Sequence, residues 1–123
     1  MAARALVLFA HGARSAAWAA PFERLRELAA ARLPGCEVSL AFLELMTPSL
    51  PDAVAALAAR GVDDVTVVPV FLGQGGHLQR DLPALAEGLR AAHPGLRLTV
   101  AAPIGEDPGV LAAMAAYCAS QLS

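Results

Sequence analysis

Short apolar blocks alternate along this chain with longer segments in which apolar residues recur at helical spacing. The blocks are rich in Val, Leu and Phe and mostly lack period-two alternation, which is typical of parallel strands covered on both faces. We expect strands at Ala5–Ala10, Cys36–Leu43, Asp64–Leu72 and Leu96–Ala102. Pro69 conflicts with the third strand because proline removes a ladder donor, so we expect a bulge or an unpaired amide there.

Helix signals fill the segments that follow the strands. Four residues mark the expected helix starts: Pro21 in a first turn, and Ser49, Asp81 and Asp107 as N-caps. Gly61 and the segment His93-Pro94-Gly95 mark two helix ends. The expected apolar faces are Phe22, Leu25, Leu28 and Ala29, then Val54, Leu57 and Ala58, then Leu85 and Leu89, and finally Val110, Leu111, Met114 and Cys118.

The order of elements is therefore βαβαβαβα, which predicts an α/β fold. Right-handed crossovers leave few arrangements, and they favour a flavodoxin-like, four-stranded parallel sheet of order 2-1-3-4 with helices on both faces. The chain reverses direction between the first and third strands, and this switch point opens a crevice at their carboxyl ends. The 123 residues are enough for one domain and too few for two.

Two histidines follow the strands that flank this switch point, and both lie in glycine-bearing turns. His11 follows the first strand and His77 the third, so the predicted strand order places them face to face. Imidazole binds Co, Ni, Fe and Zn and also accepts protons near neutral pH. Glu44 closes the second strand and is a third candidate ligand, because an acid between apolar neighbours needs a partner. Such a set leaves coordination positions open for an exchangeable ligand.

Each of these residues also has a structural interpretation. His11 and His77 can be helix or turn caps, or polar groups satisfied by the fold, and Glu44 can be a structural hydrogen-bonding acid. Their convergence on one switch point favours a functional site. His93 precedes a proline at a helix end, where a helix-terminus role is expected.

The residues around the two histidines suggest what they would bind. The turn Gly73-Gln74-Gly75-Gly76 lacks the nucleotide-binding motifs, so no nucleotide is expected. It is either a flexible turn, or its missing side chains allow close approach by a broad, flat ligand. Arg14 and Arg80 flank the histidines and are either solvated surface residues or partners for carboxylates.

Composition narrows the functional classes. Hydrophobic residues make up 57% of the chain, yet no apolar run approaches the ~20 residues of a membrane span. The net charge of -2 gives no support for nucleic-acid binding. No signal peptide is recognisable before the first strand, so we expect a cytoplasmic protein. Cys36 and Cys118 are isolated, and we expect two reduced thiols that pack as small hydrophobic side chains.

A hydrolase is one alternative function. His11-Gly12 after the first strand is similar to the motif of the histidine phosphatases, whose nucleophile is preceded by a phosphate-binding arginine. Here Ala10 stands at that position, and the chain is short for that fold. Both departures argue against this interpretation.

One set of segments spans nearly the whole chain: Leu8–Arg14; Phe42–Glu44 with Pro48 and Leu50-Pro51; Val67–Leu72 with Gly75, His77, Arg80-Asp81 and Pro83; and Pro103–Gly105. In this order the set resembles the small sirohydrochlorin chelatases of cobalamin and sirohaem synthesis. The resemblance implies one chelatase-like domain over residues 1–123. It also implies ATP-independent insertion of a divalent metal, with Co²⁺ first and Fe²⁺ or Ni²⁺ as alternatives, into a sirohydrochlorin-type tetrapyrrole. The short forms are expected to pair as homodimers.

The resemblance also implies roles for individual residues. His11 would be the proton acceptor and a metal ligand, and His77 a second ligand. The macrocycle would lie along Leu72, Gly73, Gln74, Gly75 and Gly76. Ala13 replaces the family's usual serine, which removes one hydroxyl. Thr47 stands where some relatives carry a second acid, so a difference in metal preference or affinity is expected. A non-catalytic metal or tetrapyrrole carrier on the same fold is a further alternative.

Overall fold

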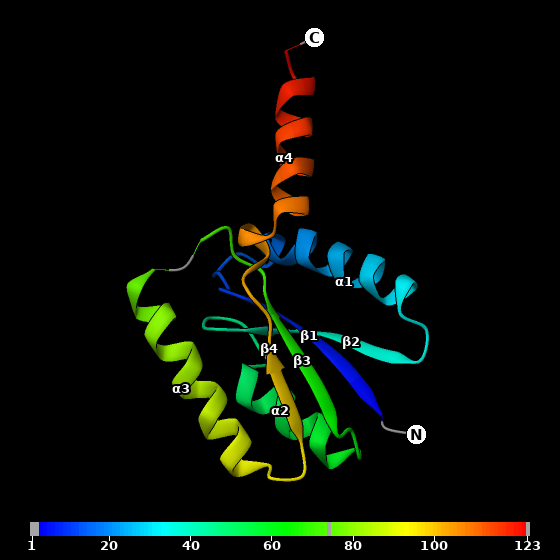
Figure 1. Cartoon of the computed structure of the whole chain (residues 1–123), viewed down its shortest axis with the longest axis vertical. Helices are drawn as coiled ribbons and strands as arrows, with labels where there is room; N and C mark the ends of the chain where they lie inside the picture. Colours follow the sequence, from blue (N-terminus) through cyan, green and yellow to red (C-terminus); the bar gives the residue numbers. More distant parts are fainter. Residues whose placement is uncertain (1–2, 74, 123) are drawn as a thin grey trace.

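A four-stranded parallel sheet forms the centre of the computed structural model, which describes residues 3–73 and 75–122, apart from the side chain of His77 (Figure 1). The strands are β1 (Arg4–Ala10), β2 (Cys36–Phe42), β3 (Asp64–Pro69) and β4 (Arg97–Val100). Their order is β2-β1-β3-β4, and all three pairings are parallel. The predicted strand order is therefore confirmed.

The third strand ends earlier than predicted, at Pro69 instead of Leu72. The amide that proline lacks would point toward β4, and the pairing with β4 already ends at Val67 and Val100. No bulge is needed, because Pro69, which has no N–H to donate, lies just beyond the last paired residues of β3 and β4. The Val70 N–H still donates to the Phe9 carbonyl at 2.8 Å, which holds the chain against β1 for one more residue.

Four α-helices and two short 3-10 helices connect or follow the strands: α1 (Ala20–Arg32), α2 (Leu50–Ala59), α3 (Gly76–Ala92) and α4 (Pro108–Ser120), with η1 (Ala16–Ala19) and η2 (Ile104–Glu106). The predicted caps of α2 and α4 are confirmed. Ser49 accepts the Asp52 N–H at 3.2 Å, and Asp107 accepts the Val110 N–H at 3.0 Å. Gly61 follows the end of α2 with φ +88°, as a C′ glycine should.

The predicted start of α3 is wrong. The helix begins at Gly76 with Gly75 as its N-cap, so Asp81 lies inside it and does not cap it. The glycines that suggested a continuing turn are instead the entry to the helix. At the other end His93 is the C-cap, and its N–H donates to the Leu89 carbonyl at 3.0 Å, in agreement with the predicted helix-end role.

Successive residues of the strands point to opposite faces of the sheet and contribute to two separate hydrophobic cores. On one face Val7, Phe9 and Val67 pack with the apolar faces of α2 and α3. On the other face Leu8 and Leu40 belong to a second core that packs against α1. The α1 face is narrower than predicted: Phe22, Leu25 and Ala29 contact this core, whereas Leu28 is 51% exposed.

The last helix does not cover the sheet. α4 projects away from the body of the molecule, and none of its residues is buried (Figure 1). Of the residues expected to form its apolar face, Val110 is half-buried and the others are exposed. Cys118 is among the exposed residues, contrary to expectation, while Cys36 is half-buried. Within the described residues, no helix has both the length and the apolar content needed to cross a membrane.

Candidate functional site

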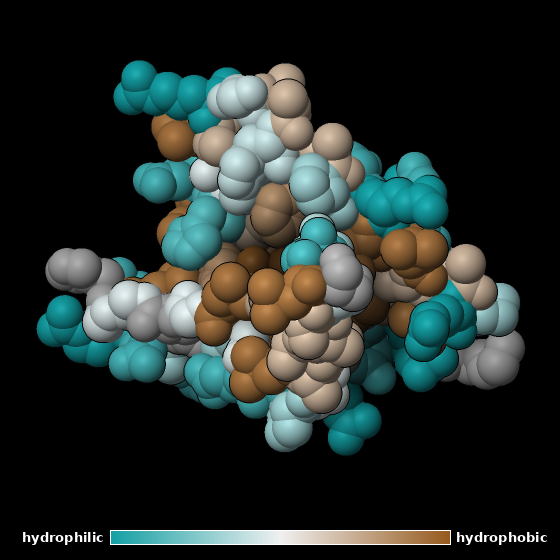
Figure 2. All heavy atoms as spheres, turned by 90° about the horizontal axis from the view of Figure 1, so that it is seen from above, coloured by the Kyte–Doolittle hydropathy of each residue, from teal (hydrophilic) through white to brown (hydrophobic). Residues whose placement is uncertain are grey.

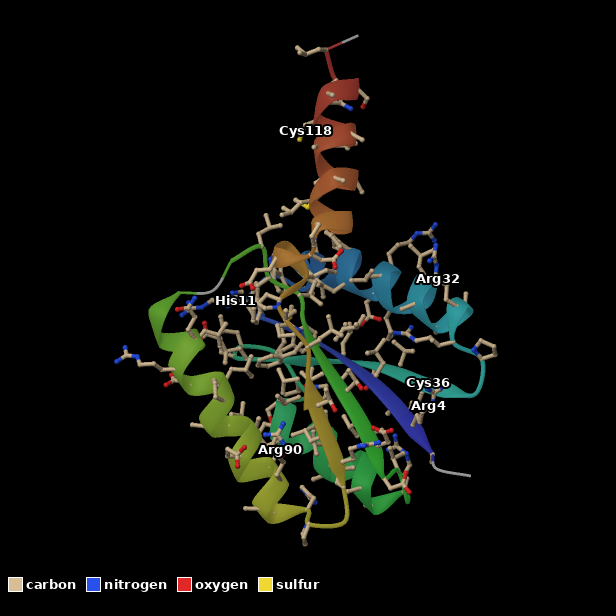
Figure 3. All side chains as sticks on the ribbon, in the orientation of Figure 1. Arg4, His11, Arg32, Cys36, Arg90 and Cys118 are labelled. Atoms are coloured by element: carbon tan, nitrogen blue, oxygen red, sulfur yellow. The ribbon has the colours of Figure 1, made fainter. Side chains whose placement is uncertain are left out.

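His11 lies at the carboxyl end of the sheet, opposite the end that carries Arg4 and Cys36 (Figure 3). Its exposed imidazole rests on Phe71, with ring centroids 4.4 Å apart and planes tilted by 43°. Phe71 is buried and meets Phe9 edge-on at 5.8 Å. The segments that leave β1 and β3 therefore meet at the predicted switch point, and a rigid aromatic stack supports the imidazole from below.

The segment that follows β2 is hydrogen-bonded through its backbone to the end of β1, at the junction around His11. The Leu43 N–H donates to the Ala10 carbonyl at 2.9 Å, and the Glu44 N–H donates to the His11 carbonyl at 3.0 Å. Gly12 permits this approach: its φ is +95°, and a Cβ atom there would lie 1.8 Å from the Glu44 carbonyl oxygen. Only glycine fits where these two loops cross.

A tight turn follows Glu44. The Met46 N–H donates to the Glu44 carbonyl at 2.8 Å across Leu45, whose φ is +67°. This γ-turn places a branched residue in the left-handed region, which costs about 1–3 kcal/mol and is typical of functional loops. The turn leaves Leu45 59% exposed. The loop then passes through the cis peptide bond Thr47-Pro48 to Ser49.

Three exposed leucines surround the histidine junction: Leu43, Leu45 and Leu72, which are 42%, 59% and 67% exposed. Leu43 and Leu45 lie on the loop bonded to His11, and Leu72 directly follows Phe71. We name these three residues the leucine ledge. Sequence reasoning singled out Leu72 but missed Leu43 and Leu45. The sequence signal for these two residues was the alternation of apolar and polar residues in Leu43-Glu44-Leu45. This alternation was missed as a sign of exposure because it resembles the end of a buried strand.

The charged residues near the junction are exposed and little constrained. The Glu44 carboxylate and the Arg14 guanidinium have no hydrogen bond or ion pair within the described part of the chain, so the expectation that Glu44 needs a partner is wrong. Arg80 donates from Nε to the Gly76 carbonyl at 3.4 Å and is also exposed. Thr47 is exposed as well. These polar groups are therefore available to a ligand from solution.

The glycine-bearing segment after Leu72 is described only in part. Gly73, Gly75 and Gly76 are exposed, and each has open space where a Cβ atom would be. Gln74 lies outside the described residues. These three glycines therefore leave room for a broad ligand to approach their backbone.

His77 lies in the first turn of α3 and not in a turn before it, which corrects the expected placement. The structure does not describe the side chain of His77, so the expected contact between His77 and His11 stays a prediction. Among the described residues, no group of three or more His, Cys, Asp and Glu side chains is placed to hold a metal. The geometry therefore brings together His11 and the backbone of Glu44. The ligand set of His11, His77 and Glu44 stays a prediction.

The sheet order defines an α/β protein of the flavodoxin-like class, and the exposed histidine at its switch point places the candidate chemistry at the carboxyl ends of β1 and β3. Comparison with protein families makes this specific. Residues 5–120 match the CbiX family, and the chain belongs to that family.

Individual relatives agree with this assignment. A sirohydrochlorin cobaltochelatase of Sulfurisphaera tokodaii is 37% identical over 70 residues, which cover 57% of this chain and 55% of the relative. The match thus spans little more than half the length of that curated protein. The crystal structure of a CbiX protein from Marinobacter aquaeolei VT8 superposes with a TM-score of 0.85 at 36% identity and covers 97% of both chains.

A larger relative shows a similar fold. The sirohydrochlorin chelatase SirB from Bacillus subtilis subspecies spizizenii, solved in complex with cobalt, superposes with a TM-score of 0.74 at 25% identity. The alignment covers 87% of this chain but only 45% of SirB. One copy of the present chain therefore corresponds to about half of that protein.

Proposed function

We propose that this chain inserts a divalent metal ion into a sirohydrochlorin-type tetrapyrrole without ATP, acting as one chelatase-like domain over residues 1–123. The observation that carries the proposal is the exposed imidazole of His11 at the switch point of a CbiX-family sheet. Co²⁺ is the first candidate metal, because one relative is a cobaltochelatase and another was solved with cobalt. Ni²⁺ and Fe²⁺ are the alternatives.

The chemistry requires a base at the centre of the ring. Insertion of M²⁺ forms four metal–nitrogen bonds and releases two pyrrole N–H protons, so a group facing the ring centre must accept a proton. A neutral imidazole can do this and can also bind the incoming metal. We assign both roles to His11, with His77 and Glu44 as further ligands that hold the metal loosely enough for transfer.

The surroundings of His11 suit a flat, acidic macrocycle. The leucine ledge offers apolar surface for the ring, and Gly73, Gly75 and Gly76 offer backbone without side chains. Arg14 and Arg80 are exposed and available to pair with the carboxylates of the substrate. Thr47 lies at the outer end of the same loop as Glu44, where it would face the entering metal or substrate.

The assembly and location of the protein are part of the proposal. One copy corresponds to about half of a larger chelatase, so a homodimer would restore the second half of the enclosure. We place the protein in the cytoplasm. No nucleic acid, membrane or nucleotide has a role in this mechanism.

The test is turnover by purified protein supplied with sirohydrochlorin and Co²⁺, Ni²⁺ or Fe²⁺ in separate assays. We expect the absorbance of the metallated product to accumulate to many equivalents per protein. An increase that stops at one equivalent would favour the alternative function, a carrier of metal or tetrapyrrole. No spectral change with any of the three metals would refute metal insertion.

A further inference from the structure

The imidazole of His11 lacks the hydrogen bond that usually orients such a group. A histidine that binds a metal or accepts a proton commonly donates its other ring N–H to a fixed acceptor, which sets the direction of the ring. Within the residues that the structure describes, the side chain of His11 forms no hydrogen bond and no ion pair. Figure 2 looks onto the end of the molecule at which α4 projects and shows apolar residues gathered around the middle of that face. The orientation of this imidazole must therefore come from packing.

The ring of Phe71 beneath the imidazole supplies that packing. The centroids of the two rings lie 4.4 Å apart, and Phe71 itself is only 4% exposed. The buried ring of Phe9 in turn meets Phe71 edge-on at 5.8 Å. A core side chain that is confined in this way stays in one rotamer, so the ring of Phe71 is a fixed platform for the imidazole.

The backbone around Phe71 is held by two other elements, although it lies beyond the end of β3. From β1, the Phe9 carbonyl accepts the Val70 N–H at 2.8 Å. From η2, the Gly105 N–H donates to the Phe71 carbonyl at 2.9 Å. Two elements that are distant in the sequence, β1 and η2, therefore fix the segment that carries the platform.

Gly105 also sets how closely η2 approaches this segment. Gly105 is buried, and a Cβ atom there would lie 2.1 Å from the Leu72 carbonyl oxygen and 2.4 Å from the Leu72 Cα atom. Both are backbone atoms, so the segment itself would have to move to accommodate a side chain at position 105. Any residue other than glycine would thus displace Leu72 together with the adjoining Phe71.

We propose that Phe71 and Gly105 are positioning residues for metal insertion: the ring of Phe71 orients the imidazole of His11, and Gly105 holds Phe71 in place. Neither residue has to touch the metal or the macrocycle for this role. The inference rests on the proposed function and deepens it, since it names what places the base at the centre of the macrocycle. A reacting group that is misplaced by about 1 Å can lose about 100-fold in rate, so the platform decides how fast the imidazole can act.

The first experiment measures kcat and KM for cobalt insertion into sirohydrochlorin at equal concentrations of folded protein. It compares the wild type with Phe71→Leu, Gly105→Ala and the control Val38→Ala. Val38 belongs to the core on the α1 face of the sheet, so its truncation removes buried apolar volume away from Phe71. Phe71→Leu introduces no clash, so it carries the test even if Gly105→Ala does not fold.

The expected effect falls on kcat. For Phe71→Leu, kcat should fall about 10- to 100-fold while KM changes less than about threefold, because the imidazole loses its orientation but the surface that binds the macrocycle stays. Gly105→Ala should lower kcat by a similar factor, and Val38→Ala should keep the wild-type kcat. A kcat for Phe71→Leu within about twofold of the control, or a raised KM at unchanged kcat, would overturn the inference.

A second experiment needs no turnover. Protons above the face of an aromatic ring are shielded, so the imidazole C–H signals of His11 should lie upfield in NMR spectra of the wild type at alkaline pH. His11→Ala assigns these signals by their loss. They should move downfield in Phe71→Leu and Gly105→Ala and keep their positions in Val38→Ala, and signals that do not move in Phe71→Leu would contradict the proposal. A wild type that shows these shifts but inserts no metal would refute only the proposed function, whereas a fully active Phe71→Leu protein would refute this inference alone.

Discussion

Replacing Gly12 with alanine should destabilise the protein and separate the two loops that carry His11 and Glu44. The added Cβ atom would lie 1.8 Å from the Glu44 carbonyl oxygen, which is backbone and cannot rotate away. The φ of +95° adds a second penalty, because alanine in the left-handed region costs about 1–2 kcal/mol. Relief of the clash requires the loops to part.

The loss of stability caused by the steric clash can be estimated from the hydrogen bonds that would break. Parting the loops breaks the hydrogen bonds from Leu43 to Ala10 and from Glu44 to His11, each of which contributes about 1 kcal/mol net. Together with the conformational penalty, the free energy of unfolding should fall by about 3–4 kcal/mol. That is a large share of the stability of a domain of this size.

Gly61→Ala is the matched control. Gly61 has φ +88° but open space where its Cβ atom would be, so alanine there meets only the conformational penalty. Urea unfolding followed by circular dichroism should give a loss of about 1–2 kcal/mol for Gly61→Ala and clearly more for Gly12→Ala. Equal losses in the two variants would show that the loop crossing does not bear on stability.

Three further predictions concern the surroundings of His11. Arg14→Ala and Arg80→Ala should each weaken sirohydrochlorin binding about 10- to 100-fold, measured by fluorescence titration, because each removes a charged hydrogen-bond donor; unchanged affinity in both would remove them from the site. Leu45→Gly should raise the free energy of unfolding by about 1 kcal/mol, because glycine adopts the left-handed φ without strain. The same variant should insert metal more slowly, because the leucine ledge loses one of its three leucines, and a lower stability would contradict the strain argument. The insertion rate should fall as the solution is made acidic, because a protonated imidazole neither accepts a proton nor binds a metal; a rate independent of pH would argue against an imidazole base.

Rules of chain connectivity and local capping made much of the fold predictable. The strand order follows from right-handed crossovers between alternating elements, and the structure has that order. Ser49 and Asp107 cap their helices because a short acceptor side chain precedes an apolar periodic segment. The start of α3 was missed because glycines at 75 and 76 resemble a turn, although they lie at a helix entry.

The site was less predictable, since it depends on contacts between loops. The position of His11 follows from strand order, but its stacking on Phe71 and the crossing of Gly12 over Glu44 depend on how three loops pack. The exposure of Leu45 comes from a tight turn that has no sequence signature of its own. The apolar periodicity of α4 predicted the helix correctly, but it did not predict that the helix projects from the sheet with no buried residue.

The measurement that tests the central claim most directly is the initial rate of cobalt insertion into sirohydrochlorin by His11→Ala, followed by absorbance at equal concentrations of folded protein. The imidazole is exposed and rests on Phe71, so the unfolding free energy should change by about 1 kcal/mol or less while insertion is almost abolished. His93→Ala, at the end of α3, should insert cobalt at the wild-type rate. A His11→Ala protein that inserts cobalt near the wild-type rate would contradict the mechanism, even if it still bound the metal.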